Sequence, residues 1–72
     1  GLDLSNGHDL ERFDYARADL VGATFEKSNL RFATFADATC TKAIFRKADL
    51  TGVSLNGSKL EGADFRGAIT TN

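Results

Sequence analysis

The residues with the most evident potential for chemistry are one cysteine and one histidine in a chain of 72 residues. Cys40 could serve as a nucleophile and His8 as a proton carrier, but neither stands in a motif with a second catalytic residue type. One Cys and one His cannot complete a four-ligand zinc site, and a single Cys excludes an internal disulfide. The chain also has no phosphate-binding loop and no dinucleotide fingerprint. We therefore predict no enzyme, no catalytic residue, no cofactor and no metal.

Acidic and amide side chains recur at multiples of five residues, which raises the question of calcium. Calcium-binding β-helices use glycine-rich nonapeptides, whose spacing differs from this one. Short Asp and Asn side chains often bond to nearby backbone groups, so we interpret these residues as exposed and locally hydrogen-bonded. They are Asp9, Asp14, Asp19, Asn29, Asp49 and Asp64.

The overall charge excludes several classes of partner. Nine basic and ten acidic residues are interspersed along the chain and give a net charge of −1. General binding to nucleic-acid phosphates needs an uncompensated basic surface, and a membrane-binding segment needs a basic cluster. No apolar run approaches the roughly 18–20 residues of a membrane span, and no signal segment opens the chain. We expect a soluble, cytoplasmic protein with no nucleic-acid or membrane partner.

A five-residue repeat runs through the sequence from Leu10 to Phe65. We call the third residue of each five its centre, and the centres are bulky and apolar apart from one cysteine. Two residues before the centre stands Ala, Ser or Val at all eleven positions from 18 to 68. The centres are Leu10, Tyr15, Leu20, Phe25, Leu30, Phe35, Cys40, Phe45, Leu50, Leu55, Leu60 and Phe65.

A period of five fits neither an α-helix nor a straight strand. It would spread the centres around a helix axis and alternate them between the two sides of a strand. All of them can be buried if the chain bends once in every five residues, with glycine suited to the corners. Centres twenty residues apart match in type, as at Phe25, Phe45 and Phe65. We therefore predict an all-β, parallel β-helix with four segments per turn and about three coils of 20 residues.

The residues that carry this pattern resemble the pentapeptide-repeat family, whose motif is A-[D/N]-L-x-x. The motif reads Ala18-Asp19-Leu20, Ser28-Asn29-Leu30 and Ala48-Asp49-Leu50 in this chain. The resemblance covers residues 8 to 70 and implies a right-handed quadrilateral β-helix. The recorded functions of the family vary.

We expect one domain over residues 1–72, with repeats over 8–70 and an N-terminal cap or irregular repeat over 1–7. Leu4 and Leu10 are six residues apart, so an extra residue lies near Gly7. His8 and Phe13 stand where Ala belongs, and we expect their bulk to close the core beneath the first coil.

Folding the sequence at twenty residues brings four basic residues to the face above Phe25, Phe45 and Phe65. Glu26 and Asp64 lie on the same face and reduce its charge to about +2 (four basic minus two acidic residues). We interpret the four as a candidate partner-binding strip; the alternative is an ordinary solubilising surface. Outward-facing Phe32, Ile44 and Ile69 are either part of an interface or scattered exposed residues. The strip consists of Lys27, Arg46, Lys47 and Arg66.

The leading functional hypothesis is a non-catalytic scaffold or protein-interaction module with an unidentified protein partner, because solenoids present regular surfaces. Open coil ends expose unpaired backbone edges. We therefore expect either an end-to-end homodimer or an adjoining domain of a longer chain. The family resemblance implies an alternative, a DNA-mimicking protein that inhibits or protects a type II topoisomerase (DNA gyrase). Members with that activity are long, strongly acidic rods, unlike this short and nearly neutral chain.

Overall fold

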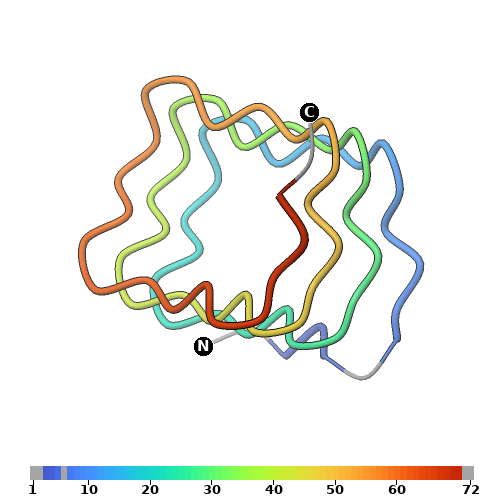
Figure 1. The fold of residues 1–72 in the computed structure, drawn as a ribbon. Helices are drawn as coiled ribbons and strands as arrows, with labels where there is room; N and C mark the ends of the chain where they lie inside the picture. Colours follow the sequence, from blue (N-terminus) through green and yellow to red (C-terminus); the bar gives the residue numbers. More distant parts are fainter. Residues whose placement is uncertain (1–2, 6, 71–72) are drawn as a thin grey trace.

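The computed structural model describes residues 3–5 and 7–70. The chain winds into a right-handed coil with four flat sides, and each side is built from one five-residue segment per coil (Figure 1). Residues 3–5 lie against the last side at the N-terminal end. Side A holds 8–12, 28–32, 48–52 and 68–70; side B holds 13–17, 33–37 and 53–57; side C holds 18–22, 38–42 and 58–62; side D holds 23–27, 43–47 and 63–67.

Parallel β-bridges join each side to the same side of the next coil. Nine of the ten bridges among the described residues link partners 20 residues apart, from Asp9 with Asn29 to Asp49 with Ile69. Each bridge is one residue long, so residues 3–5 and 7–70 form no longer strand and no helix. The predicted coil of twenty residues is confirmed.

The remaining bridge shows where the repeat is interrupted. Asp3 pairs with Thr24, a separation of 21 residues, so one extra residue is accommodated between Asp3 and Asp9. The prediction of an irregular cap over 1–7 falls partly on residues 1, 2 and 6, which lie outside the described residues. His8 does not fill the core as expected: it is exposed, and its Nδ1 lies 2.6 Å from the Ser5 carbonyl oxygen. This polar contact holds the ring over the backbone beside the extra residue.

Every corner uses the same backbone conformation. The N–H of the residue that opens a segment donates to the carbonyl of the preceding centre, as from Ala23 to Leu20 at 3.0 Å. The residue two places after the centre has positive φ, which together with this bond is typical of a type II turn. Glycine meets the requirement in five of these twelve corners, but non-glycine residues adopt the same φ in the other seven. These are Arg12, Arg17, Lys27, Phe32, Asp37, Lys42 and Lys47, with φ between 58° and 64°.

Gly52 marks a corner where the missing side chain matters. A Cβ at Gly52 would lie 2.5 Å from Cδ1 of Phe32, whose ring leans over it from the coil before. On the same corner column, the Arg12 guanidinium carbon lies 5.0 Å from the centroid of the Phe32 ring. The exposed aromatic residue is therefore held between a cation and a bare backbone.

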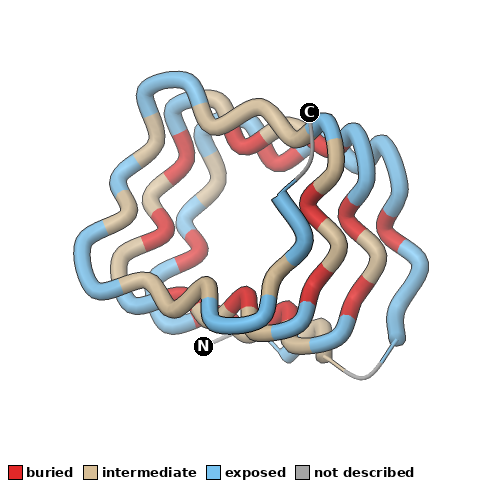
Figure 2. The backbone as a smooth tube through the Cα atoms, viewed as in Figure 1, coloured by how far each residue is buried: buried red, intermediate tan, exposed pale blue. Residues whose placement is uncertain are grey.

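The core is a stack of centres lined by small side chains, seen as columns of buried positions in Figure 2. On side D, the rings of Phe25, Phe45 and Phe65 stack with centroids 5.2 and 5.0 Å apart. Phe35, from the opposite side B, meets Phe25 and Phe45 edge to face at 5.6 Å. Because two aromatic columns fill the axis, the other inward position has space only for a small residue, and Ala43 is fully buried there.

The two ends of the coil differ in how well they are covered. Leu10, Tyr15 and Leu20, in the first coil, are 4–9% exposed. The last coil places Leu55, Leu60 and Phe65 at intermediate exposure, packed against the core on one side only. Phe13 was expected to close the first coil, but it is 52% exposed and covers Tyr15 with one edge, at 5.3 Å between ring centroids.

Candidate interaction surface

The structure places all four residues of the basic strip on side D and its following corner. Lys27 and Lys47 occupy successive turns of one corner column and are exposed. Arg46 and Arg66 come directly after the centres Phe45 and Phe65. Main-chain bonds fix the spacing of the strip, since Lys27 N–H donates to Arg46 O at 3.0 Å and Lys47 N–H to Arg66 O at 3.1 Å. The strip is therefore a rigid array set by the coil.

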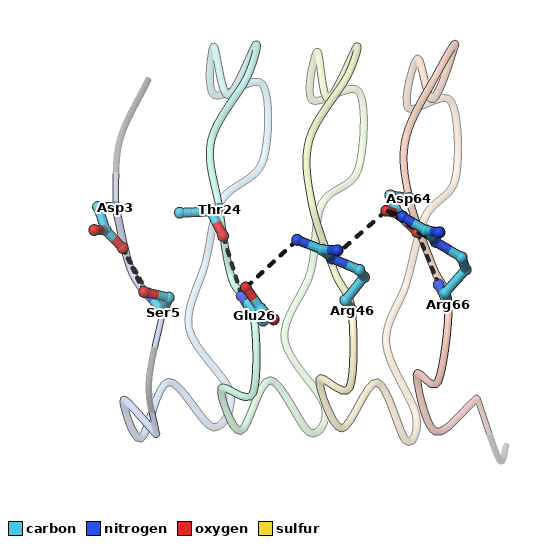
Figure 3. Close-up of polar contacts among 7 residues, drawn as sticks. All are labelled: Asp3, Ser5, Thr24, Glu26, Arg46, Asp64 and Arg66. Carbon is cyan, nitrogen blue, oxygen red and sulfur yellow. Dashed lines mark hydrogen bonds and ion pairs between the residues drawn. The ribbon is translucent and has the colours of Figure 1, made fainter.

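The two arginines take part in a ladder of alternating charge along side D, shown in Figure 3. Arg46 Nη2 lies 3.7 Å from Glu26 Oε1 on the coil below. Its Nε lies 3.6 Å from Asp64 Oδ2 on the coil above. Asp64 then accepts from Arg66 Nη2 at 2.8 Å. The ion pairs orient both arginines and partly neutralise them.

Asp64 is the most strongly perturbed carboxyl of this surface. Hydrogen bonds from the Arg66 side chain, then the Arg66 backbone N–H, lower its pKa from 3.8 to about 2. Arg46 contributes a smaller coulombic effect in the same direction. The carboxylate is charged at every physiological pH, so the ladder is a permanent feature of the surface.

An acidic residue that the sequence reasoning left out also belongs to this surface. Asp3 bridges to Thr24 and so lies at the N-terminal end of side D. Its carboxylate accepts hydrogen bonds from Ser5, chiefly from the hydroxyl at 2.6 Å, and these lower its pKa. Counting Asp3 with Glu26 and Asp64 gives four basic minus three acidic residues, or +1 in place of the expected +2. The change of register near Gly7 had hidden Asp3 from the twenty-residue alignment.

Lys27 and Lys47 remain as the accessible cations of the strip. Neither forms an ion pair among the described residues. The Lys47 stem packs over the next corner, because a Cβ at Gly67 would lie 3.2 Å from Lys47 Cγ. The ammonium groups thus extend from supported stems at the edge of side D.

A second diagonal ion pair lies outside the strip. Arg31 Nε is 3.9 Å from Asp49 Oδ2. Both Arg31–Asp49 and Arg46–Asp64 join residues 18 apart. Once a coil of twenty is assumed, an Arg after one centre and an Asp before the centre of the next coil are neighbours, so this spacing is a signal that could have revealed both pairs.

The other residues with potential for chemistry take structural positions. Cys40 is fully buried between Leu20 and Leu60 in the core stack, and burial raises the pKa of its thiol. The recurrent acidic and amide residues accept bonds from the N–H two residues on, as in Asp14 with Ala16 at 2.9 Å and Asn29 with Arg31 at 3.1 Å. The interpretation of local backbone bonding is confirmed.

Binding features for small ligands were also sought among residues 3–5 and 7–70. This part of the chain has no pocket and no group of three or more potential metal ligands. It also has no helix with the length and apolar character needed to cross a bilayer. Of the outward apolar residues, Phe32 and Ile69 are 45% and 50% exposed, and Ile44 is half-buried. They lie on different sides and corners, so they form no single patch.

A four-sided, right-handed β-solenoid built on five-residue steps defines the class of protein. The family model for pentapeptide repeats matches this chain in eight copies, over residues 9–39, 16–52 and 33–69. The chain therefore belongs to the pentapeptide repeat family, and the family match indicates no catalytic class. Among curated protein sequences, none matches the chain.

Solved structures of pentapeptide repeat proteins share the fold. Rfr23 of the cyanobacterium Cyanothece 51142 is 32% identical with a TM-score of 0.81, over 86% of this chain and 43% of its own. HetL of Nostoc sp. strain PCC 7120, involved in heterocyst differentiation regulation, is 30% identical with a TM-score of 0.82, over 86% of this chain and 30% of its own. A protein of the Arabidopsis thaliana thylakoid lumen is 34% identical with a TM-score of 0.59, over 94% of this chain and 57% of its own. This chain thus spans between about a third and somewhat over half of these relatives.

Proposed function

We propose that this chain is a non-catalytic scaffold that binds a protein partner through the basic strip on side D. The observation that carries the proposal is the pair of accessible ammonium groups of Lys27 and Lys47, stacked one coil apart at about 4.8 Å. The coil fixes their spacing, so a partner would meet them with little loss of conformational freedom. A protein surface with carboxylates at a similar spacing fits this arrangement best.

The membership of a non-catalytic family supports a role through binding. One relative, HetL, is involved in the regulation of heterocyst differentiation. A regulatory role of this kind is compatible with a solenoid that presents fixed side chains on flat faces. Nothing in the described surface favours the alternative of a DNA mimic, because the ladder on side D alternates in charge where a mimic needs a continuous row of carboxylates.

The strip can be tested by a charge reversal with a matched control. Lys27→Glu/Lys47→Glu changes the strip, and Lys42→Glu/Lys59→Glu makes the same change in net charge away from side D. Crosslinked partners captured by the wild-type chain from cells of its source should be lost with the first variant and kept with the second. A partner retained equally by both variants would exclude the strip as its binding site.

We also propose that the end of the last coil pairs with further β-structure, from a second copy or an adjoining segment of a longer chain. In the first two coils, the N–H of each centre bonds to the coil above, as from Phe35 to Ser54 at 2.8 Å. The corresponding N–H groups of Leu55, Leu60 and Phe65 have no backbone partner among the described residues. Light scattering over a range of concentrations tests self-association, and a monomer at every concentration would leave only the adjoining segment.

A further inference from the structure

Asn56 and Gly57 form an exposed pair at the corner between sides B and C of the last coil. Gly57 has φ of +72° and no side chain to hinder approach to its amide nitrogen. The Asn56 side chain forms no hydrogen bond with the described residues. An asparagine followed by glycine is the sequence in which a main-chain nitrogen most easily reaches a side-chain amide carbon.

The position of this corner leaves the main-chain nitrogen free. On the same corner column, Arg17 N–H donates to Ala36 O and Asp37 N–H donates to Asn56 O, both at 2.8 Å. These bonds restrain the corners of the two inner coils. Gly57 N–H is the next donor in the column, and it has no backbone acceptor among residues 3–5 and 7–70.

We propose that Asn56 is a site of spontaneous deamidation. Gly57 N–H gives its proton to solvent base, and the nitrogen attacks Asn56 Cγ to form a cyclic imide while the side-chain nitrogen leaves as ammonia. Water then opens the imide at either carbonyl. The product is aspartate, or isoaspartate in which the main chain runs through the β-carbon. No oxidation or reduction occurs, and water is the only co-reactant.

The products would change this corner in two ways. Either one adds a carboxylate beside Asp37, whose own carboxylate leans against Gly57. Like charges at close range repel each other. Isoaspartate also inserts an extra carbon into the main chain, which breaks the five-residue spacing. The reaction would therefore loosen the last coil, where Leu55 and Leu60 are already only partly covered.

Asn29 is an internal control that shares the fold but lacks the geometry. Its own N–H donates to His8 O at 2.9 Å, and the N–H of the following residue, Leu30, donates to Asp49 O at 2.9 Å. The nitrogen that would attack is therefore bonded and shielded by a buried side chain. Asn6 is also followed by glycine, but it lies outside the described residues.

The experiment follows each asparagine by mass spectrometry after incubation of the folded protein at mildly alkaline pH. Trypsin separates them into peptides 1–12, 28–31 and 48–59. We expect the acid form to accumulate in 48–59 several times faster than in 28–31. An isoaspartate methyltransferase with labelled methyl donor should label 48–59, and Asn56→Gln should abolish the signal.

Three outcomes would overturn the proposal. One is an unchanged 48–59 peptide in the folded protein. Another is an acid form that appears only after unfolding in urea, which would show that the corner protects Asn56. The third is an equal rate in 28–31, which would mean that the free nitrogen of Gly57 has no effect.

Discussion

The corner at Gly52 offers a direct test of how the coils interlock, through the pair of substitutions Gly22→Ala and Gly52→Ala. Both glycines have positive φ, 68° and 70°. An L-residue in this conformation costs about 1–2 kcal/mol. The stiffer unfolded chain offsets about 0.4–1 kcal/mol of that cost. Gly22→Ala should therefore lower the free energy of unfolding by about 1 kcal/mol, because a Cβ at Gly22 meets nothing within 4 Å.

Gly52→Ala should cost more, because its Cβ would lie 2.5 Å from Phe32 Cδ1. Carbon atoms pack best at about 3.5–4.0 Å, so the ring must retreat by about 1 Å. Phe32 is half-exposed and can swing outward, but it then loses its contact with Arg12, worth about 0.5–1 kcal/mol. We expect Gly52→Ala to exceed Gly22→Ala by about 1 kcal/mol, or roughly 4–8 °C in melting temperature for a domain of this size.

A double-mutant cycle assigns the excess to the ring. Thermal and urea unfolding followed by circular dichroism would be measured for Phe32→Ala, Gly52→Ala and the double variant. Without the ring, the cost of Gly52→Ala should fall to that of Gly22→Ala. Equal losses for the two single glycine variants, or an excess that persists without the ring, would show that the ring does not lean on this corner.

Three further predictions concern the core and the ladder. Tyr15→Phe should raise the free energy of unfolding by about 1–2 kcal/mol, because the buried phenolic oxygen has no hydrogen-bond partner among the described residues; a loss in urea titrations would mean that the hydroxyl is bonded. Phe45→Ala removes the middle ring of the side D stack and should cost about 3–5 kcal/mol in the same titrations, and a loss under half of this would show that the column collapses to fill the space. The depressed pKa of Asp64, about 2, stabilises the fold above its usual value of 3.8 and loses this effect as the pH falls toward 2. Stability measured from pH 5 to 2 should therefore fall less steeply for Asp64→Asn, and an unchanged slope would contradict the assignment.

The fold could be predicted from the sequence because one physical requirement recurs at every step. Side chains at intervals of five reach a common interior only if the chain turns a corner each time, and the match of Phe25, Phe45 and Phe65 sets the coil at twenty residues. The structure confirms that register in every bridge from Asp9 onward. Regular repetition leaves few alternatives, so twelve small observations all favour the same arrangement.

The details that were missed lie where the repetition stops. His8 and Phe13 were expected to fill the end of the core, but the extra residue near Gly7 turns the chain and leaves both exposed. The same shift moved Asp3 onto side D. The position of the basic strip followed from the period alone, whereas the pairing of Arg46 with Glu26 and Asp64 depends on side-chain geometry that a periodic pattern does not contain.

The uniform corners have a practical consequence for spectroscopy. Non-glycine residues occupy seven of them with nearly the same φ, and their side chains project away from the core. Probes attached at positions 17 and 37 would therefore sit one coil apart, at about 4.8 Å. Cys40 is sealed in the interior and would not compete for thiol-directed labels while the protein is folded. Such a pair would act as a molecular ruler, and any lengthening of its distance would report the slip or separation of adjacent coils.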